Sequence, residues 1–315
     1  MGSSILRHVA EQRQILKVYL ADSMQQLAEQ CAPLINSPVK LDQLLKAHFK
    51  KNSNFKYLWV LDHTAHQLTA TISRKKIKED QRGRDRAARR YMQRALKGDA
   101  FYLSEAYISR FRKRPSLTAV QTIFDENGRT IGYLGADFDL RKLPYTAKLN
   151  LGKKGWMQLK GDPAIRGGLF AQQRVVSAMD EKLDDVLDLI QELIIAHGIF
   201  HAKLHFSSSR ATLWLVDTPY DYQILNIDEL TDASVCLAFP KRDYFEQATI
   251  PRKKIAKIFK QFKKLRFADE TIYLRSASLN VVNGKVGLNF SCDGSHYVSY
   301  DEFLEKDNSF WFGVK

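Results

Sequence analysis

The sequence predicts an α+β protein in which a long N-terminal helix and an antiparallel five-stranded sheet are followed by a second α+β domain. Apolar residues recur at helical spacing over residues 5–31, which indicates one long helix. Alternating strand-like runs begin near residue 55. Two Asn-Gly pairs, at 127–128 and 283–284, each join two such runs as hairpin turns. A chain of 315 residues has room for two domains.

The first domain is expected over residues 1–144. Its long helix carries one apolar stripe and ends before Pro33 and Pro38, and a short helix follows over residues 39–49. The stripe consists of Ile5, Val9, Leu16, Leu20, Met24, Leu27 and Cys31, widened by Ile15, Val18 and Tyr19. After it we expect strands at 57–61 and 67–72, a helix at 85–97, and strands at 100–103, 116–124 and 129–138. This order favours an antiparallel sheet with helices packed on it.

Residues 145–155 are interpreted as a linker, and residues 156–315 as the second α+β domain. Two helices are predicted there, at 174–197 and, strongly basic, at about 252–265. Strands are expected at 203–206, 211–216, 236–239, 271–275, 277–282 and 285–290.

The formal charge of +14 is concentrated in two stretches. Residues 74–94 hold ten Lys or Arg against three acids, and residues 252–266 hold eight and no acid. Such stretches bind nucleic acid or an anionic surface, or they are solvated faces of ordinary elements. In the second stretch, the apolar stripe of the helix favours docking on a domain core.

The location expected from the sequence is the cytoplasm. The N-terminus lacks the apolar core of a signal peptide, and no window of about 18 apolar residues could form a transmembrane segment. Three widely spaced cysteines, Cys31, Cys236 and Cys292, fit reduced thiols better than a disulfide framework. No cofactor is expected.

An enzymatic alternative rests on residues of the second half. His201 and His205 are four residues apart, a spacing that keeps both on one face of a helix or a strand, and Cys292 and His296 could complete a zinc site. Ser207 to Ser209, with Asp293 and His296, are also the residue types of a hydrolase triad. Neither set has the spacing of a standard motif, and histidines bonded within a sheet are commoner.

Four segments of the first half follow one another in the order of a known motif set: GRDRAARRYM at 83–92, ALKG at 95–98, SEAYISR at 104–110 and GYLGADFDL at 132–140. Together they resemble the Cache family, also called the PDC fold, over roughly residues 55–142. The resemblance implies a PAS-like sheet and a sensor domain that holds a small molecule between the sheet and the segment above it. The C-terminal half resembles no family that we identify.

The resemblance also implies five ligand-binding residues. Arg89 and Tyr91 match the polar contacts on the loop side, Tyr107 and Ser109 the pocket strand, and Asp137 the closing acid. Chemically, an arginine binds a carboxylate, tyrosines donate hydroxyls and an aspartate receives an ammonium group. The remaining arginines of the segment, Arg84, Arg86 and Arg94, are expected to be surface charges.

The favoured hypothesis is therefore a non-enzymatic, cytoplasmic sensor that binds a small molecule, with a mild preference for a carboxylate. Ligand binding would order residues 74–94 and shift the packing of the long helix, which passes the signal to the C-terminal domain. The stripe of that helix suits a homodimer. A basic nucleic-acid-binding protein and a metal-dependent or hydrolytic enzyme using His201, His205 and His296 are the alternatives.

Overall fold

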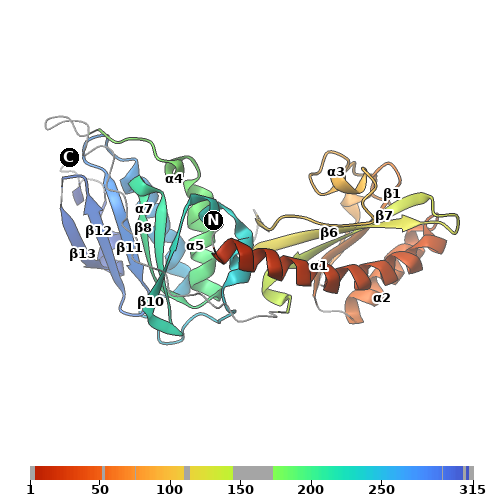
Figure 1. Ribbon diagram of the computed structural model, residues 1–315, viewed down its shortest axis with the longest axis horizontal. Coiled ribbons are helices and arrows are strands. Elements are labelled where there is room, and N and C mark those ends of the chain that lie inside the picture. Colours follow the sequence, from red (N-terminus) through yellow and green to blue (C-terminus); the bar gives the residue numbers. More distant parts are fainter. Residues whose placement is uncertain are drawn as a thin grey trace. The chain divides into compact units, whose positions relative to one another are not determined.

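The computed structural model describes residues 4–51, 54–74, 76–109, 114–144, 173–292, 294–307 and 310–311 (Figure 1). The chain divides into two compact units, residues 7–147 and residues 148–315 together with 1–6. The predicted linker at 145–155 lies outside the described residues. None of the helices in these ranges combines the length and the apolar character needed to span a membrane.

The N-terminal unit is a seven-stranded antiparallel sheet with helices against it. Along the chain it contains α1 (Ser4–Cys31), α2 (Pro38–Lys51), β1 (Phe55–Asp62), β2 (Thr71–Ile72), β3 (Ile77–Lys78), α3 (Met92–Ala95), β4 (Phe101–Leu103), β5 (Tyr107–Ile108), β6 (Pro115–Phe124) and β7 (Thr130–Asp139). The strand order is β3-β2-β1-β7-β6-β4, and β5 also pairs with β6. Strands β1, β2, β4, β6 and β7 correspond to the five predicted ones, and the short strands β3 and β5 raise the number to seven.

Two predicted elements are much shorter than expected. The strand at 67–72 is reduced to Thr71–Ile72, and the helix at 85–97 to Met92–Ala95. Residues 79–95 cover the second face of the sheet, and we call them the covering segment. Both differences have one cause, because backbone bonds tie this segment to the turn after β1: Gly83 N donates to Gln67 O, Gln67 N to Arg84 O and Arg86 N to Ala65 O. These bonds use backbone groups that a regular helix or strand would need.

The two faces of this sheet have different covers. Side chains alternate along β7, so Ala136 and Phe138 point to one face while Gly135 and Asp137 point to the other. Helices α1 and α2 lie on the first side and the segment with α3 lies on the second (Figure 1). The predicted stripe of α1 is buried, including Leu16, Leu20, Met24, Leu27 and Cys31, as expected for a helix packed on a sheet.

A close approach on the second side depends on glycine. A Cβ atom at Gly135 would lie 2.3 Å from the indole of Trp59, which pairs with it across β1 and β7. The indole therefore lies flat across strand β7. It forms the floor of an apolar cluster with Leu61, Met92, Val120 and Tyr133.

The C-terminal unit is a six-stranded antiparallel sheet of order β10-β9-β8-β11-β12-β13. Its elements are α4 (Ala178–Glu181), α5 (Leu183–Ala196), β8 (Ile199–His205), β9 (Arg210–Leu215), β10 (Thr218–Leu225), α6 (Ile227–Thr231), α7 (Ile255–Arg266), β11 (Leu274–Asn280), β12 (Lys285–Phe290), β13 (Ser295–Ser299) and α8 (Tyr300–Glu305). The apolar stripe of α7 is buried (Ile255, Ile258, Phe259, Phe262 and Leu265), so this basic helix docks on the core as predicted.

Several strand predictions in this unit were wrong. The segment predicted as a strand at 236–239 mostly lies in a 3₁₀ helix, Ala233–Ala238, whose start is capped by the Asp232 side chain bonding Ser234 N. The predicted strands at 271–275 and 277–282 are parts of a single strand, β11, with a bulge between Leu274 and Ser276. The edge strands β10 and β13 were missed because they are largely exposed and therefore lack apolar alternation.

A fully buried ion pair holds α4 against α7 and β11. Two guanidinium nitrogens of Arg266, Nε and Nη2, donate to the Asp180 carboxylate over 2.8 and 2.7 Å, and Nη1 donates to the Leu274 carbonyl over 2.9 Å. The guanidinium also lies over the rings of Phe206 and Tyr273. Burial by itself raises the pKa of Asp180, but hydrogen bonds from Arg266 and Ser177 outweigh it and hold the pKa below its ordinary value.

We expect Arg266→Met to lower the free energy of unfolding of this unit by about 3–5 kcal/mol, because a buried carboxylate loses both hydrogen bonds from Arg266 and keeps only the more distant Arg174, at 3.9 Å, as a cation. Lys263→Met is the control, since Lys263 lies on the same helix as Arg266 but makes a solvent-exposed ion pair with Asp184 of α5 and should matter little. Urea unfolding measures both. Because the pKa of Asp180 is lowered in the folded state, the ionised carboxylate stabilises the folded unit at pH values above its unfolded pKa. This stabilisation is lost as the pH falls through the folded pKa. Equal losses in the two variants would contradict this assignment.

Candidate functional site

The candidate site is built on the face of the N-terminal sheet that carries Asp137. This residue pairs with Tyr57 on β1 and with Thr118 on β6, so the three side chains form one row across neighbouring strands. The hydroxyl of Thr118 donates to Asp137 Oδ1 over 2.7 Å. Strand β5 brings the hydroxyl of Tyr107 to 3.1 Å from Thr118 Oγ1 and 3.5 Å from Asp137 Oδ1.

Above this row, Arg86 is held in place from three directions. Its guanidinium lies 4.7 Å from the ring centre of Trp59. Nε donates to Gln67 Oε1 over 2.7 Å and Nη1 donates to the hydroxyl of Tyr91 over 3.1 Å. Gln67 is itself buried and anchored through Nε2 to Thr69 O and Thr71 Oγ1. We call Asp137, Thr118, Tyr107, Arg86 and Tyr91 the Asp137 cluster.

The electrostatics of the cluster favour a ligand with polar groups. Burial raises the pKa of Asp137, while the Thr118 hydrogen bond and the positive charges of Lys56 and Arg86 oppose the rise. Burial and the negative charge of Asp137 raise the pKa of Tyr107, so its hydroxyl stays protonated. Among the described residues, no ion pair joins the Asp137 carboxylate to a cation. The carboxylate and the guanidinium are thus near one another without neutralising each other by direct contact.

Three of the five predicted ligand-binding residues come together here: Tyr91, Tyr107 and Asp137. Tyr107 is still 40% exposed, which leaves the cluster open to solvent on the β5 side. Ser109 follows β5, and its buried hydroxyl has no hydrogen-bond partner within the described part of the chain.

Arg89, the fifth predicted residue, is exposed, and the arginine beside the cluster is Arg86. The expectation that Arg86 is a surface charge was therefore wrong. Residues 79–91 have no regular period that would show which arginine turns inward, so sequence reasoning had no signal for this choice. Thr118 was also missed, because none of the four motif segments includes the strand at 116–124, although that strand and its hairpin with 129–138 were predicted.

The residues proposed for a metal or hydrolytic site do not meet. His201 and His205 lie on β8, whereas the His296 ring packs beside Phe290 and Trp311. Cys292 is exposed, and Asp293 lies outside the described residues. No three His, Cys, Asp or Glu side chains in the described ranges are grouped to bind a metal ion. Ser209 accepts a bond from Met179 N at the start of α4, which is a structural role.

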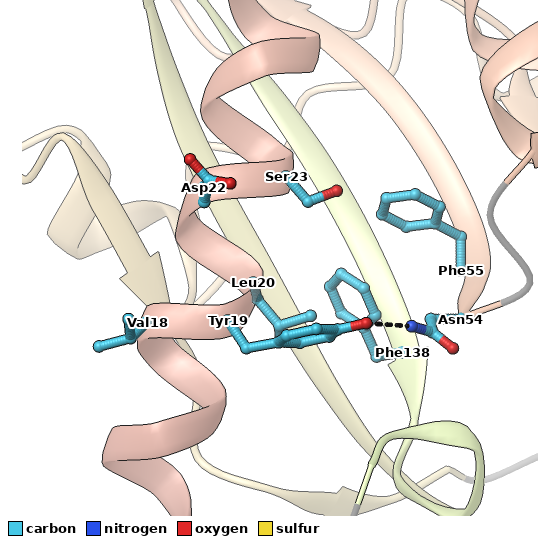
Figure 2. A pocket seen from close by; sticks show the side chains of 8 residues that line it. All are labelled: Val18, Tyr19, Leu20, Asp22, Ser23, Asn54, Phe55 and Phe138. Carbon is cyan, nitrogen blue, oxygen red and sulfur yellow. Dashed lines mark hydrogen bonds between the residues drawn. The ribbon is translucent and has the colours of Figure 1, made fainter.

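A hollow lies on the other side of the same sheet, between α1 and the strands. It measures about 570 Å³, with Leu20, Phe55 and Phe138 as its apolar lining and Asp22, Ser23 and Asn54 as polar lining. Figure 2 shows Phe138 of β7 facing α1 and the Asn54 side chain donating to the hydroxyl of Tyr19 over 3.1 Å. Phe138 follows Asp137 directly, so adjacent residues of β7 line the hollow and the Asp137 cluster.

No protein-family model and no curated protein matches the chain. Similar solved structures include the ligand-binding domain of the chemoreceptor Tlp3 of Campylobacter jejuni in complex with 4-methylisoleucine, at 16% identity over 43% of this chain and 56% of that chain, with a TM-score of 0.34. Another is the ligand-binding domain of the chemoreceptor CtaA of Pseudomonas fluorescens in complex with L-isoleucine, at 19% identity over 42% and 53%, with a TM-score of 0.32. These are sensory domains of the Cache type, and the chain spans slightly more than half of their length.

Replacing Arg86 is expected to cost stability. Arg86→Leu should lower the free energy of unfolding of the N-terminal unit by about 1–3 kcal/mol, because it leaves the buried Gln67 oxygen without its donor. The matched variant Arg89→Leu removes the same charge from an exposed side chain and should change it by no more than about 0.5 kcal/mol. Thermal or urea unfolding measures the difference, and a larger loss in the Arg89 variant would refute the assignment.

A second prediction concerns the raised pKa of Asp137. Since the folded environment favours the neutral form, Asp137→Asn should raise the Tm at pH 7 while keeping an oxygen that accepts from Thr118. In the wild type, protonation of the Asp137 carboxyl makes the folded unit more stable as the pH falls from the folded pKa toward the lower pKa of the unfolded chain. The Tm difference between wild type and variant should therefore shrink at acidic pH. A variant that melts earlier than wild type at both pH values would show that the carboxylate stabilises the empty protein.

Proposed function

We propose that residues 7–147 form a sensor module that binds a small polar molecule at the Asp137 cluster. The observation that carries the proposal is that the Asp137 carboxylate, oriented by Thr118 and Tyr107, feels the positive charge of a guanidinium, that of Arg86, which is held by Gln67 and Trp59. Because both charged side chains are already held in place before binding, less conformational entropy is lost when a ligand binds.

The charges indicate the kind of ligand. Arg86 uses two of its five N–H groups on Gln67 and Tyr91, which leaves donors for a carboxylate. Asp137 suits an ammonium group or a hydroxyl donor, and the ring of Tyr107 offers an apolar wall. A small carboxylate that also carries an amine or hydroxyl fits this arrangement best. The chemoreceptor domains described above are ligand-binding domains, and we extend that role to this unit as part of the proposal.

A route from the ligand to α1 follows from the alternation along β7. Asp137 would contact the ligand, and Phe138 points into the hollow beside α1. Movement of β7 on binding would press Phe138 toward Leu20, and the hollow gives the helix room to shift. The ligand drives this change only if it binds the shifted arrangement more tightly.

Dimerisation and a cytoplasmic location remain predictions. The stripe of α1 that suggested a homodimer is buried within the chain, so a dimer would have to use the exposed residues Ile15, Val18 and Tyr19 on the same helix.

A thermal-shift screen of small carboxylates, amines and amino acids tests the proposal on the full chain. A ligand at a hundred times its dissociation constant stabilises the folded state by about 2.7 kcal/mol. We expect Asp137→Asn to abolish the shift and Asp80→Asn to preserve it, because Asp80 is an exposed acid of the covering segment. Compounds that shift wild type and Asp137→Asn equally would place the binding site elsewhere.

A further inference from the structure

One face of the C-terminal sheet carries aromatic and basic side chains that have no part in the proposed sensor. Alternate residues of its strands are buried on one face, such as Ala202 and Leu204 of β8. The opposite side chains belong to what we call the open face, which runs across the strands from β10 to β13 (Figure 1). By strand pairing it comprises Tyr222, Trp214, His201, Asn280 and Lys285 in one row, Thr212, Lys203, Ser278, Gly287 and Tyr297 in a second, and His205, Ser276, Asn289 and Ser295 in a third.

The charged residues in the strands of this sheet are nearly all basic. Lys203 and Lys285 lie on the open face, and Arg210 and Arg275 lie at its end in β9 and β11. Asp221, in the irregular part of edge strand β10, is the one acidic residue of the six strands. Asp301, at the start of α8, acts on Lys285 by its charge, so the basic side chains outnumber the nearby acids rather than lacking them. A sheet face with an excess of cations attracts polyanions.

Tyr297 forms an aromatic platform at one end of the open face. It pairs with Gly287, and a Cβ atom at that glycine would lie 3.0 Å from Tyr297 Cε1 and 3.3 Å from Cδ1. The ring thus occupies the space above the glycine, with one side against the sheet. The residue is nevertheless 74% exposed, so the other side of the ring is available for stacking.

A second aromatic group lies toward the other edge. The rings of His201 and Trp214 are stacked, with centroids 4.5 Å apart and an interplanar angle of 14°, and Tyr222 follows at 6.1 Å from Trp214. Burial and the neighbouring charge of Lys203 lower the pKa of His201, which keeps the imidazole neutral and suited to stacking.

A small polar pocket lies beside the Tyr297 platform. It has a volume of about 200 Å³ and is lined by Arg275, Ser276, Asn289, Phe290 and Ser295. Ser295 is two residues before Tyr297 on β13, so both point to the same face. A guanidinium, two hydroxyls and an amide are donors for the oxygens of a phosphate.

We propose that the open face binds a single-stranded nucleic acid, with bases stacked on Tyr297 and on the His201–Trp214–Tyr222 group and a phosphate in the Arg275 pocket. Aromatic rings that stack on bases, combined with cations that follow the backbone, are the general means of holding single strands. Strand β13 and strand β8, which carries the nearest ring of the second group, are three strand spacings apart, about 14 Å, so one nucleotide cannot stack on both aromatic groups. A duplex hides its base faces and is excluded from stacking. This inference is independent of the ligand site at Asp137, and it does not use the basic stretches at 74–94 and 252–266.

Fluorescence anisotropy with labelled 15-nucleotide single strands of RNA and DNA tests the proposal on the full chain. Tyr297→Ala and Arg275→Ala should each weaken binding about tenfold, while Tyr297→Phe, which keeps the ring, should bind as wild type does. Affinity should fall steeply with added salt. The matched control is Lys257→Ala/Lys260→Ala, which removes two exposed charges from α7, the helix whose apolar stripe packs into the core.

Competition with unlabelled duplex and with mononucleotides distinguishes the alternatives. Duplex that competes as well as the single strand, or a mononucleotide that competes at equal concentration, would overturn the proposal. So would a greater loss in the α7 double variant than in the Tyr297 and Arg275 variants. Melting temperatures show whether Tyr297→Ala remains folded, and Arg275→Ala, outside the tyrosine–glycine contact, decides the question if it does not.

Discussion

The contact of the Arg86 guanidinium with Trp59, reinforced by its bond to Gln67, ties the covering segment of the N-terminal unit to the sheet. That segment has little regular structure besides α3 and a 3₁₀ turn at Glu79–Gln81, so it is positioned by its backbone bonds to the turn after β1 together with these side-chain contacts. Trp59 can lie flat only because Gly135 has no side chain. The Asp137 cluster depends on this arrangement, since it places Arg86 and Tyr91 above the row that holds Asp137 and Thr118.

The same alternation of side chains that builds this cluster also connects it to α1. Asp137 and Phe138 are neighbours in the chain and lie on opposite faces of β7. A polar site and the packing of a long helix are therefore separated by one strand. The proposed route from the ligand to α1 uses this arrangement.

Several cations of the two basic stretches serve the fold. Arg82 pairs with Asp42 and Glu79, and Arg266 is completely buried with Asp180. Arg86 also lies over Trp59, and it is the cation that the proposed ligand site uses. The open face of the C-terminal sheet has fewer basic residues, but they lie beside aromatic rings, and the proposed single-strand site is based on that combination.

The sequence by itself determined the elements with a strong local pattern. The stripe of α1 and the Asn-Gly hairpins β6–β7 and β11–β12 were predictable, because period and turn chemistry act over a few residues. Tyr91, Tyr107 and Asp137 were named through the resemblance of short motifs, and the structure brings these three side chains together. Only the tertiary structure decided that Arg86 rather than Arg89 faces the cluster, since nothing periodic orients an irregular segment. It also decided that Tyr107 and Thr118 reach the same oxygen of Asp137, because the pairing of the short strand β5 with β6 has no local pattern to specify it. The open face could not be read from the chain either, because β10 and β13 lack apolar alternation, and strand pairing brings Trp214, His201 and Tyr297 onto one surface from distant parts of the sequence.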